Sequence, residues 1–286
     1  MTPTVDEALR AAAARIGAAL GFDFDTAFLE ARVLLAHALC CAPARLVAAG
    51  RDPLAMSAQA QFAALVERRA AGEPVAYLTG TREFYGLELV VSPATLIPRP
   101  ETEQLVDEAL ARIPRGGEPR IVDAGTGSGA VALAVATARP ACFVAGVDAS
   151  AAALAVAHGN ARRLRVSNVG WLRGDWLAAV GPASVDLVVS NPPYVRADDP
   201  HLAAGDLRFE PRAALAAGAD GLDAVRTLVA GARAALKPGG WLLFEHGFDQ
   251  GEVSRQLLET ARFGTIFTVP DLAGRDRVSG GRRLSG

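Results

Sequence analysis

A glycine-rich turn between an apolar segment and a helical segment constrains the fold of this chain more than any other feature. Residues 120–124 read RIVDA, and the helical pattern AVALAVATA follows at residues 130–138. Between them lie Gly125, Thr126, Gly127, Ser128 and Gly129. Glycine is needed where a backbone turns sharply and approaches a ligand closely at the start of a helix. The turn therefore predicts a strand, a ligand-binding loop and a helix, in that order.

Strand and helix patterns alternate along the chain after Thr102. Helical spacing is found at residues 149–164 and 222–236. Apolar strand patterns lie at residues 120–125, 142–148, 169–174, 185–191, 239–246, 264–270 and 277–284. Such alternation is typical of an α/β fold with a doubly wound, mostly parallel sheet, here of seven strands.

The N-terminal part has a different pattern. Apolar residues recur at helical spacing through residues 4–71, Thr4 and Glu7 form a capping-box sequence, and Gly21 ends the first predicted helix. Residues 84–91 alternate like a strand or hairpin, and three prolines follow before residue 101. We expect a helical substrate-docking domain over residues 1–72, a connector over 73–102 and a catalytic domain over 103–286.

Length, charge and cysteine content exclude several classes of protein. The 286 residues suffice for about two domains of ~150 residues each. The net charge of −2 provides no overall attraction to nucleic acid or to an anionic membrane. Three cysteines, two of them adjacent, do not form a secreted disulfide framework, and the N-terminus lacks a signal-peptide pattern. A cytoplasmic protein without a membrane span is expected.

A carboxylate follows the strand after the glycine turn. Asp148 ends the predicted strand 142–148, where its oxygens can accept both hydroxyl hydrogens of a ribose. The turn and Asp148 together predict a nucleoside-bearing cofactor. Because Gly125, Gly127 and Ala130 also satisfy the dinucleotide-binding pattern, a nicotinamide-dependent oxidoreductase remains open at this point.

The strand pattern VDLVVS ends at a second motif, Asn191, Pro192, Pro193 and Tyr194. An amide nitrogen is a poor nucleophile because its lone pair is delocalised, so an enzyme that methylates it must polarise its N–H bonds. The Asn191 side-chain oxygen and the Pro192 carbonyl can accept the two hydrogens, and the Tyr194 ring can pack on the planar amide. The motif predicts an amino or amide methyltransferase.

Other polar residues permit more than one interpretation. Glu245 and His246 are expected to form a hydrogen-bonded loop pair rather than a catalytic dyad. Glu210 is expected either to brace the Asn191 loop or to form a loop salt bridge. In the segment IPRPETE, either Arg99, Glu101 and Thr102 close over the methionine end of the cofactor, or the prolines only stiffen a linker. The four histidines lack metal-ligand spacing, so no metal is expected.

The chain resembles the release factor glutamine methyltransferases, a family of class I S-adenosylmethionine-dependent enzymes with a Rossmann-like fold, over nearly its full length. The resemblance is carried by PVAYLTGTREFYGLEL, IPRPETE, DAGTGSGAVAL, VDAS, GDW, SNPPYV, FEPRAALAAGADGL, EHG and DLAGRDRV. Ala217 and Leu272 depart from residues common in the family, in loops. The resemblance implies cofactor contacts at Gly125–Gly129, Asp148, Asp175, Trp176 and Asn191, with the target glutamine held by Asn191, Pro192, Pro193 and Tyr194.

The family's activity is methylation of the side-chain nitrogen of the glutamine in the Gly-Gly-Gln motif of class 1 peptide chain release factors, which supports translation termination. A DNA or RNA amino methyltransferase, acting on adenine N6, is the alternative, since it uses the same Asn-Pro-Pro-Tyr arrangement. Such an enzyme usually needs a basic groove or a recognition domain. The helical N-terminal segment instead carries Asp23, Asp25, Glu30 and Glu67 among its charges, which favours a protein partner.

Overall fold

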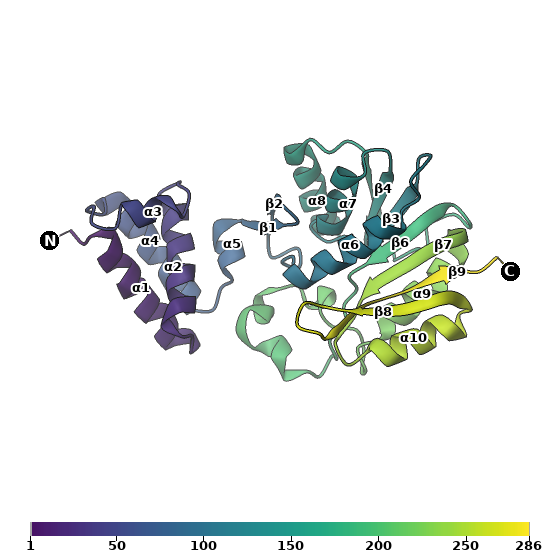
Figure 1. The fold of residues 1–286 in the computed structure, drawn as a ribbon. Helices are drawn as coiled ribbons and strands as arrows, with labels where there is room; N and C mark the ends of the chain where they lie inside the picture. Colours follow the sequence, from purple (N-terminus) through teal and green to yellow (C-terminus); the bar gives the residue numbers. More distant parts are fainter. Residues whose placement is uncertain (1, 286) are drawn as a thin grey trace. The chain divides into compact units, whose positions relative to one another are not determined.

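A computed structural model describes residues 2–285 of the chain, and two compact units can be distinguished in it (Figure 1). The first unit extends to Thr81 and also contains the later segment Ala203–Phe209. The second unit consists of Arg82–Leu202 and the chain from Glu210 onward. The first boundary between the units therefore follows Thr81, and it differs from the predicted boundaries after residues 72 and 102.

The first unit is a helical bundle, as predicted. Its helices are α1 (Val5–Leu20), α2 (Phe24–Ala38), α3 (Arg45–Ala48), α4 (Met56–Ala70) and α5 (Val75–Thr79). Thr4 caps α1 in a capping box with Glu7, and Gly21 ends α1 with a left-handed backbone, φ +72°. The apolar faces of α1, α2 and α4 form one core, and α5 packs against α2 and α4.

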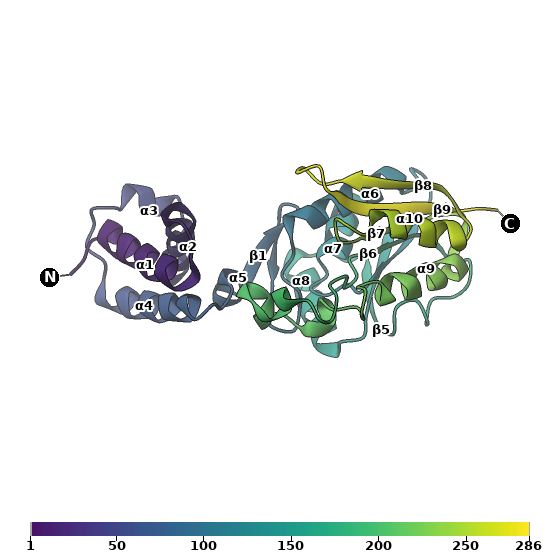
Figure 2. The ribbon, with the colours of Figure 1, turned by 90° about the horizontal axis from the view of Figure 1, so that it is seen from below.

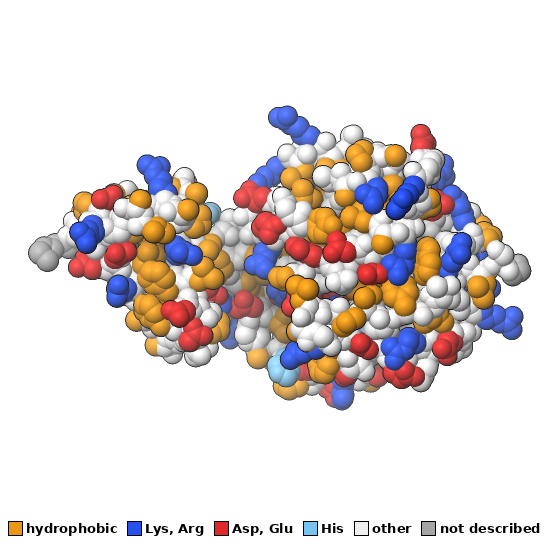
Figure 3. All heavy atoms as spheres, viewed as in Figure 1, with side chains coloured by type: hydrophobic (Ala, Val, Ile, Leu, Met, Phe, Trp, Pro, Cys, Tyr) orange, Lys and Arg blue, Asp and Glu red, His pale blue; other side chains and the backbone are white. Residues whose placement is uncertain are grey.

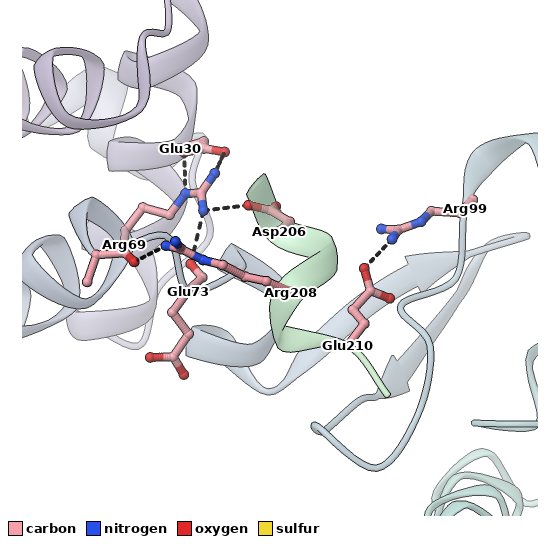
Figure 4. A network of polar contacts seen from close by, with 8 residues as sticks. Glu30, Arg69, Glu73, Arg99, Asp206, Arg208 and Glu210 are labelled. Atoms are coloured by element: carbon pink, nitrogen blue, oxygen red, sulfur yellow. Dashed lines mark hydrogen bonds and ion pairs between the residues drawn. The ribbon is translucent and has the colours of Figure 1, made fainter. Parts of the chain in front are cut away.

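A buried arginine ties the segment Ala203–Phe209 into the first unit (Figure 4). Arg69, on α4, is only 1% exposed. Its guanidinium donates to Glu30 of α2 at 2.8 Å and to Asp206 at 2.8 Å. Since a buried arginine is stable only when its charge is paired, this network fixes a segment distant in sequence to the bundle.

The second unit contains a seven-stranded sheet, as predicted. Its strands are β3 (Arg120–Ala124), β4 (Phe143–Asp148), β5 (Val169–Arg173), β6 (Val185–Ser190), β7 (Leu236–Glu245), β8 (Phe263–Pro270) and β9 (Asp276–Arg283). They lie in the order β5-β4-β3-β6-β7-β9-β8, and only the pairings of β9 are antiparallel. The strand order reverses beside β3, so the carboxyl ends of β3 and β6 border the crevice in which such sheets bind ligands.

Helices cover both faces of this sheet (Figure 2). One face packs on α6 (Glu103–Arg112), α7 (Ala130–Ala138) and α8 (Ala151–Leu164), and the other on α9 (Asp223–Ala235) and α10 (Gly251–Thr260). The predicted hairpin is present as β1 (Thr81–Phe84) and β2 (Leu87–Val90). The three layers confirm the predicted α/β fold.

Some elements were not predicted from the sequence. Helices α6 and α10 are short amphipathic helices, and 3₁₀ turns at Pro100–Thr102, Pro200–Ala203, Gly205–Phe209 and Arg212–Ala214 lie in stretches rich in proline or charge. Within residues 2–285, none of the helices combines the length and the hydrophobicity that crossing a membrane would require.

Candidate active site

A cavity of about 390 Å³ opens at the carboxyl edge of the sheet, within the second unit. The predicted residues that line it come from the ends of β3, β4, β5 and β6. They are Gly125, Thr126, Gly127, Ser128, Asp148, Asp175, Trp176, Asn191 and Pro193. Of the predicted residues, Gly129, Pro192 and Tyr194 are not among the described residues that line the cavity. The topology therefore brings the two predicted motifs together at one site.

Two glycines of the turn serve different purposes. Gly127 has φ +56° and lines the cavity, and a Cβ added there would meet no atom within 4 Å. The space beside its backbone is therefore open. Gly129 has φ +83°, and a Cβ there would lie 3.0 Å from the Trp171 ring and 3.1 Å from Ala157. Gly127 thus leaves room for a ligand, whereas Gly129 permits close packing of α7.

Asp148 holds the glycine turn as well as facing the cavity. Its Oδ2 accepts a hydrogen bond from the Gly127 backbone N–H at 2.9 Å, and its Oδ1 accepts one from Ser150 at 2.9 Å. A carboxylate oxygen can accept more than one hydrogen bond, so both oxygens retain capacity for ligand hydroxyls. Asp148 is therefore oriented by the backbone before any ligand binds.

The cavity also exposes an aromatic face beside the turn. Trp176 lies at φ +48°, a left-handed conformation that is uncommon for a bulky residue. Its ring reaches 3.6 Å from the position that a Cβ on Gly125 would take. A strained backbone is kept where the surrounding structure demands it, and here it turns the indole toward the cavity.

Asp123, which was not among the predicted site residues, lines the same cavity. Its Oδ2 accepts hydrogen bonds from the Thr126 hydroxyl at 2.6 Å and from the Ala132 N–H at 3.1 Å. Burial raises the pKa of Asp123 from 3.8 to about 6, although both hydrogen bonds act in the opposite direction. A buried carboxylate with this pKa favours a cationic ligand beside it.

The raised pKa of Asp123 leads to a stability prediction for the ligand-free protein. The native state binds the Asp123 proton more tightly than the unfolded chain, so the free energy of unfolding falls as the pH rises from about 4 to 6. Above that pH range, the ionised Asp123 lowers the free energy of unfolding by about 3 kcal/mol. Asp123→Asn removes the charge, so we expect a higher Tm than the parent at pH 8 and a similar Tm at pH 4 in thermal melts. A variant less stable than the parent at both pH values would contradict this.

The predicted residues Asn191 and Tyr194 belong to a hydrogen-bond network at the end of β6. The Asn191 Nδ2 donates to Thr102 Oγ1 at 3.1 Å, and Thr102 donates to Glu245 Oε2 at 2.6 Å. The Tyr194 hydroxyl donates to Glu245 Oε1 at 3.1 Å. Thr102 and Glu245 are 3% and 1% exposed, so the network is shielded from water.

The predicted loop pair of Glu245 and His246 is wrong. Neighbouring side chains at a strand end point to opposite faces, so Glu245 joins Thr102 and Tyr194 while His246 contacts Gly247 and Ser279. Burial raises the pKa of Glu245, opposed by its two hydrogen bonds and by the charge of Arg277.

Glu210 forms the salt bridge that was one of its two predicted roles (Figure 4). Its carboxylate pairs with Arg99 and accepts a hydrogen bond from the Ile97 N–H at 2.9 Å. Residues on both sides of this bridge line the cavity, Pro98 on one segment and Pro211 on the other. Glu210 thus joins two walls of the cavity rather than bracing Asn191.

Within residues 2–285, no group of three or more His, Cys, Asp or Glu residues is arranged to hold a metal ion. The polar side chains that line the cavity are instead carboxylates, hydroxyls and an amide. These groups suit an organic ligand with hydroxyl and ammonium groups.

Comparisons with known proteins show which families the two parts of the chain resemble. Residues 7–80 match the family model of the PrmC N-terminal domain, and residues 103–210 match that of the methyltransferase small domain. The crystal structure of a methyltransferase from Pyrococcus furiosus has a TM-score of 0.53 with this chain at 17% identity, and the match covers 76% of this chain and 97% of that one. That likeness supports the class I methyltransferase fold.

Curated relatives extend the match to nearly the whole chain. The release factor glutamine methyltransferase of Xylella fastidiosa strain 9a5c is 54% identical, with 89% of this chain and 92% of that protein covered. The proteins of the same name from Burkholderia pseudomallei and Escherichia coli K12 are 51% and 44% identical, with 89% and 88% of this chain and 91% of each relative covered. At this identity and coverage the predicted resemblance is confirmed, and the chain belongs to the release factor glutamine methyltransferase family.

Proposed function

We propose that this enzyme transfers a methyl group from S-adenosylmethionine to the side-chain nitrogen of the glutamine in the Gly-Gly-Gln motif of a class 1 peptide chain release factor. The observation that carries the proposal is the Asn191 amide at the cavity edge, anchored through its nitrogen to Thr102. This contact leaves the amide oxygen available to accept a hydrogen bond from a substrate amide. The matched relatives bear the name of this activity.

The lining of the cavity fits S-adenosylmethionine. Asp148 would accept the ribose hydroxyls, Trp176 and Asp175 would border the adenine, and the bare Gly127 backbone would permit close approach. The buried carboxylate of Asp123 would pair with the ammonium group of the methionine end. When bound, the cofactor supplies an electrophilic methyl group on a sulfonium.

The residues of the Asn-Pro-Pro-Tyr motif would prepare the nucleophile. The Asn191 oxygen and the Pro192 carbonyl accept the two N–H hydrogens of the glutamine amide, which draws electron density toward its nitrogen. Pro192 and Pro193 fix the backbone that presents these acceptors. Burial raises the pKa of Tyr194 well above its usual range, so its hydroxyl stays protonated and keeps its bond to Glu245.

Binding of the cofactor gives a direct prediction for Asp148. Asp148→Ala removes two charge-assisted hydrogen bonds, each worth about 1.5 to 3 kcal/mol, so affinity for S-adenosylhomocysteine should fall by at least about a hundredfold. Asp148→Asn keeps one acceptor oxygen, so its affinity for S-adenosylhomocysteine should lie between those of Asp148→Ala and the parent. Isothermal titration calorimetry measures both. Unchanged affinity in Asp148→Ala, or tight binding of NAD by the parent, would contradict the assignment.

The surface favours a protein partner over a nucleic acid. Basic and acidic side chains are interspersed on the visible face of the second unit (Figure 3). In the first unit, the apolar side chains of Phe24 and Leu29 are each 52% exposed, and Phe22 is 36% exposed. We infer that these exposed apolar side chains, on α2 and on the loop before it, dock the release factor. The cytoplasm, where release factors act, is the proposed location, and the free cysteines suit a reducing compartment.

A transfer assay separates the protein substrate from a nucleic acid. Tritiated S-adenosylmethionine is incubated with the enzyme and either intact release factor or duplex DNA. We expect label in the release factor and none above background in DNA. Label in DNA would promote the adenine-methylating alternative.

A further inference from the structure

We propose that Thr102 is a positioning residue for methyl transfer, which fixes the direction of the Asn191 amide through a relay anchored at Glu245. The inference rests on the proposed role of Asn191 in holding the target amide. Thr102 comes from the 3₁₀ turn Pro100–Thr102, Asn191 from the end of β6 and Glu245 from the end of β7. The relay thus joins three segments at the edge of the cavity.

The relay has a direction because its members differ in what they can donate. The hydroxyl donors Thr102 and Tyr194 and the charge of Arg277 favour the ionised form of Glu245, which only accepts. The 2.6 Å distance from Thr102 Oγ1 to Oε2 fits a hydroxyl that donates to a carboxylate. Thr102 has a single hydroxyl hydrogen, which this bond uses. Its oxygen is then left as an acceptor, and the Asn191 Nδ2 fills that place at 3.1 Å.

The consequence concerns the other end of the Asn191 amide. With its nitrogen committed to Thr102, the amide must present Oδ1 to the substrate. An amide rotated by 180° would present N–H groups to a glutamine that itself donates N–H, and the two would not pair. Thr102 therefore excludes the unproductive rotamer before the substrate arrives, at a site shielded from water.

Tyr194 reinforces the same anchor. Its hydroxyl donates to Glu245 Oε1, the oxygen that Thr102 does not use. The two oxygens of one buried carboxylate thus hold two members of the Asn-Pro-Pro-Tyr motif, Asn191 through Thr102 and Tyr194 directly. This arrangement explains a buried carboxylate that the reaction itself does not require.

The test measures kcat and KM with intact release factor. Thr102→Val keeps the shape but removes the hydroxyl, and we expect kcat to fall about 10- to 30-fold, as for loss of part of an oriented hydrogen-bonding group. The KM for release factor and the affinity for S-adenosylhomocysteine should change less than twofold. Thr102→Ser restores the hydroxyl and should recover at least half of kcat. Thr268→Val, which removes a hydroxyl from β8 on the antiparallel side of the sheet, is the matched control.

A double-mutant cycle separates positioning from a general structural role. If Thr102 acts through Asn191, adding Thr102→Val to Asn191→Ala should lower kcat no further. Glu245→Gln keeps an oxygen acceptor for Thr102 and should lower kcat less than Thr102→Val does. Two results would overturn the relay. One is equal kcat in Thr102→Val and the parent, and the other is an equal fold-decrease in kcat when Thr102→Val is added to the parent and to Asn191→Ala. Parent-level transfer by Asn191→Ala alone would instead overturn the proposed role of Asn191, and the relay with it.

Discussion

Asn191→Ala is expected to lower the rate constant for methyl transfer by about 10² to 10³, the effect of deleting one oriented hydrogen-bonding group at a reacting centre. The variant loses the side-chain oxygen that accepts an N–H of the target amide. It keeps the Pro192 carbonyl, so some activity remains. Single-turnover transfer to release factor, followed by rapid quenching, measures this step apart from product release.

Binding and chemistry should separate in this variant. Asn191 is half-buried at the end of β6, and the glycine turn that faces the cofactor belongs to β3 and α7. Affinity for S-adenosylhomocysteine should therefore fall little. Asn168→Ala is a suitable control, because Asn168 binds backbone carbonyls just before β5 begins and should leave the rate constant within about twofold. Transfer by Asn191→Ala at the parent rate would contradict the assigned role.

The double substitution Phe24→Ser and Leu29→Ser is expected to raise the KM for release factor by about 10² to 10³, with little change in kcat. A pocket formed by four residues would hold a folded protein weakly, and a second docking surface makes entry of the glutamine effectively intramolecular. Truncating two apolar side chains that contact the partner, at a cost of about 2 kcal/mol each, accounts for this range. Steady-state kinetics over a range of release factor concentrations measure it.

Substitution is preferable to removal of the helical unit. A chain beginning near residue 73 would lack Arg69, the partner that holds Asp206, and Glu30, which pairs with Arg69. Phe143→Ser serves as the control, because it removes an exposed phenylalanine from β4 of the second unit. It shows whether loss of exposed apolar area alone changes the KM. An unchanged KM in the double variant, with its melting temperature intact, would rule out docking on α2.

Most of the fold could be predicted from short sequence patterns, because helix ends and strands depend mainly on residues that are close in sequence. The capping box at Thr4, the left-handed Gly21 and the seven strand patterns each depend on neighbours in sequence. The glycine turn and Asp148 were predictable for the same reason, since parallel strands bring their carboxyl ends to one edge. Helix α6 was missed because it is short and follows directly after three prolines.

The parts that escaped prediction depend on interactions between distant segments. Thr102 and Glu245 are separated by 143 residues, and the sequence offered no signal that they share a hydrogen bond. Asp206 joins the first unit through Arg69, 137 residues earlier in the chain. Asp123 could have been predicted as a site residue, because it lies in the strand just before the glycine turn. An acidic residue in a mostly apolar strand at that position indicates a binding role.

Locating the methyl group on the substrate tests the proposed activity directly. Release factor is incubated with the enzyme and S-adenosylmethionine carrying an isotopically labelled methyl group, then digested and sequenced by tandem mass spectrometry. We expect one added methyl group, on the side chain of the glutamine in the Gly-Gly-Gln motif, and no methylation of a release factor in which that glutamine is replaced by alanine. Methylation at another residue, or equal methylation of the Gln→Ala protein, would contradict the proposed activity.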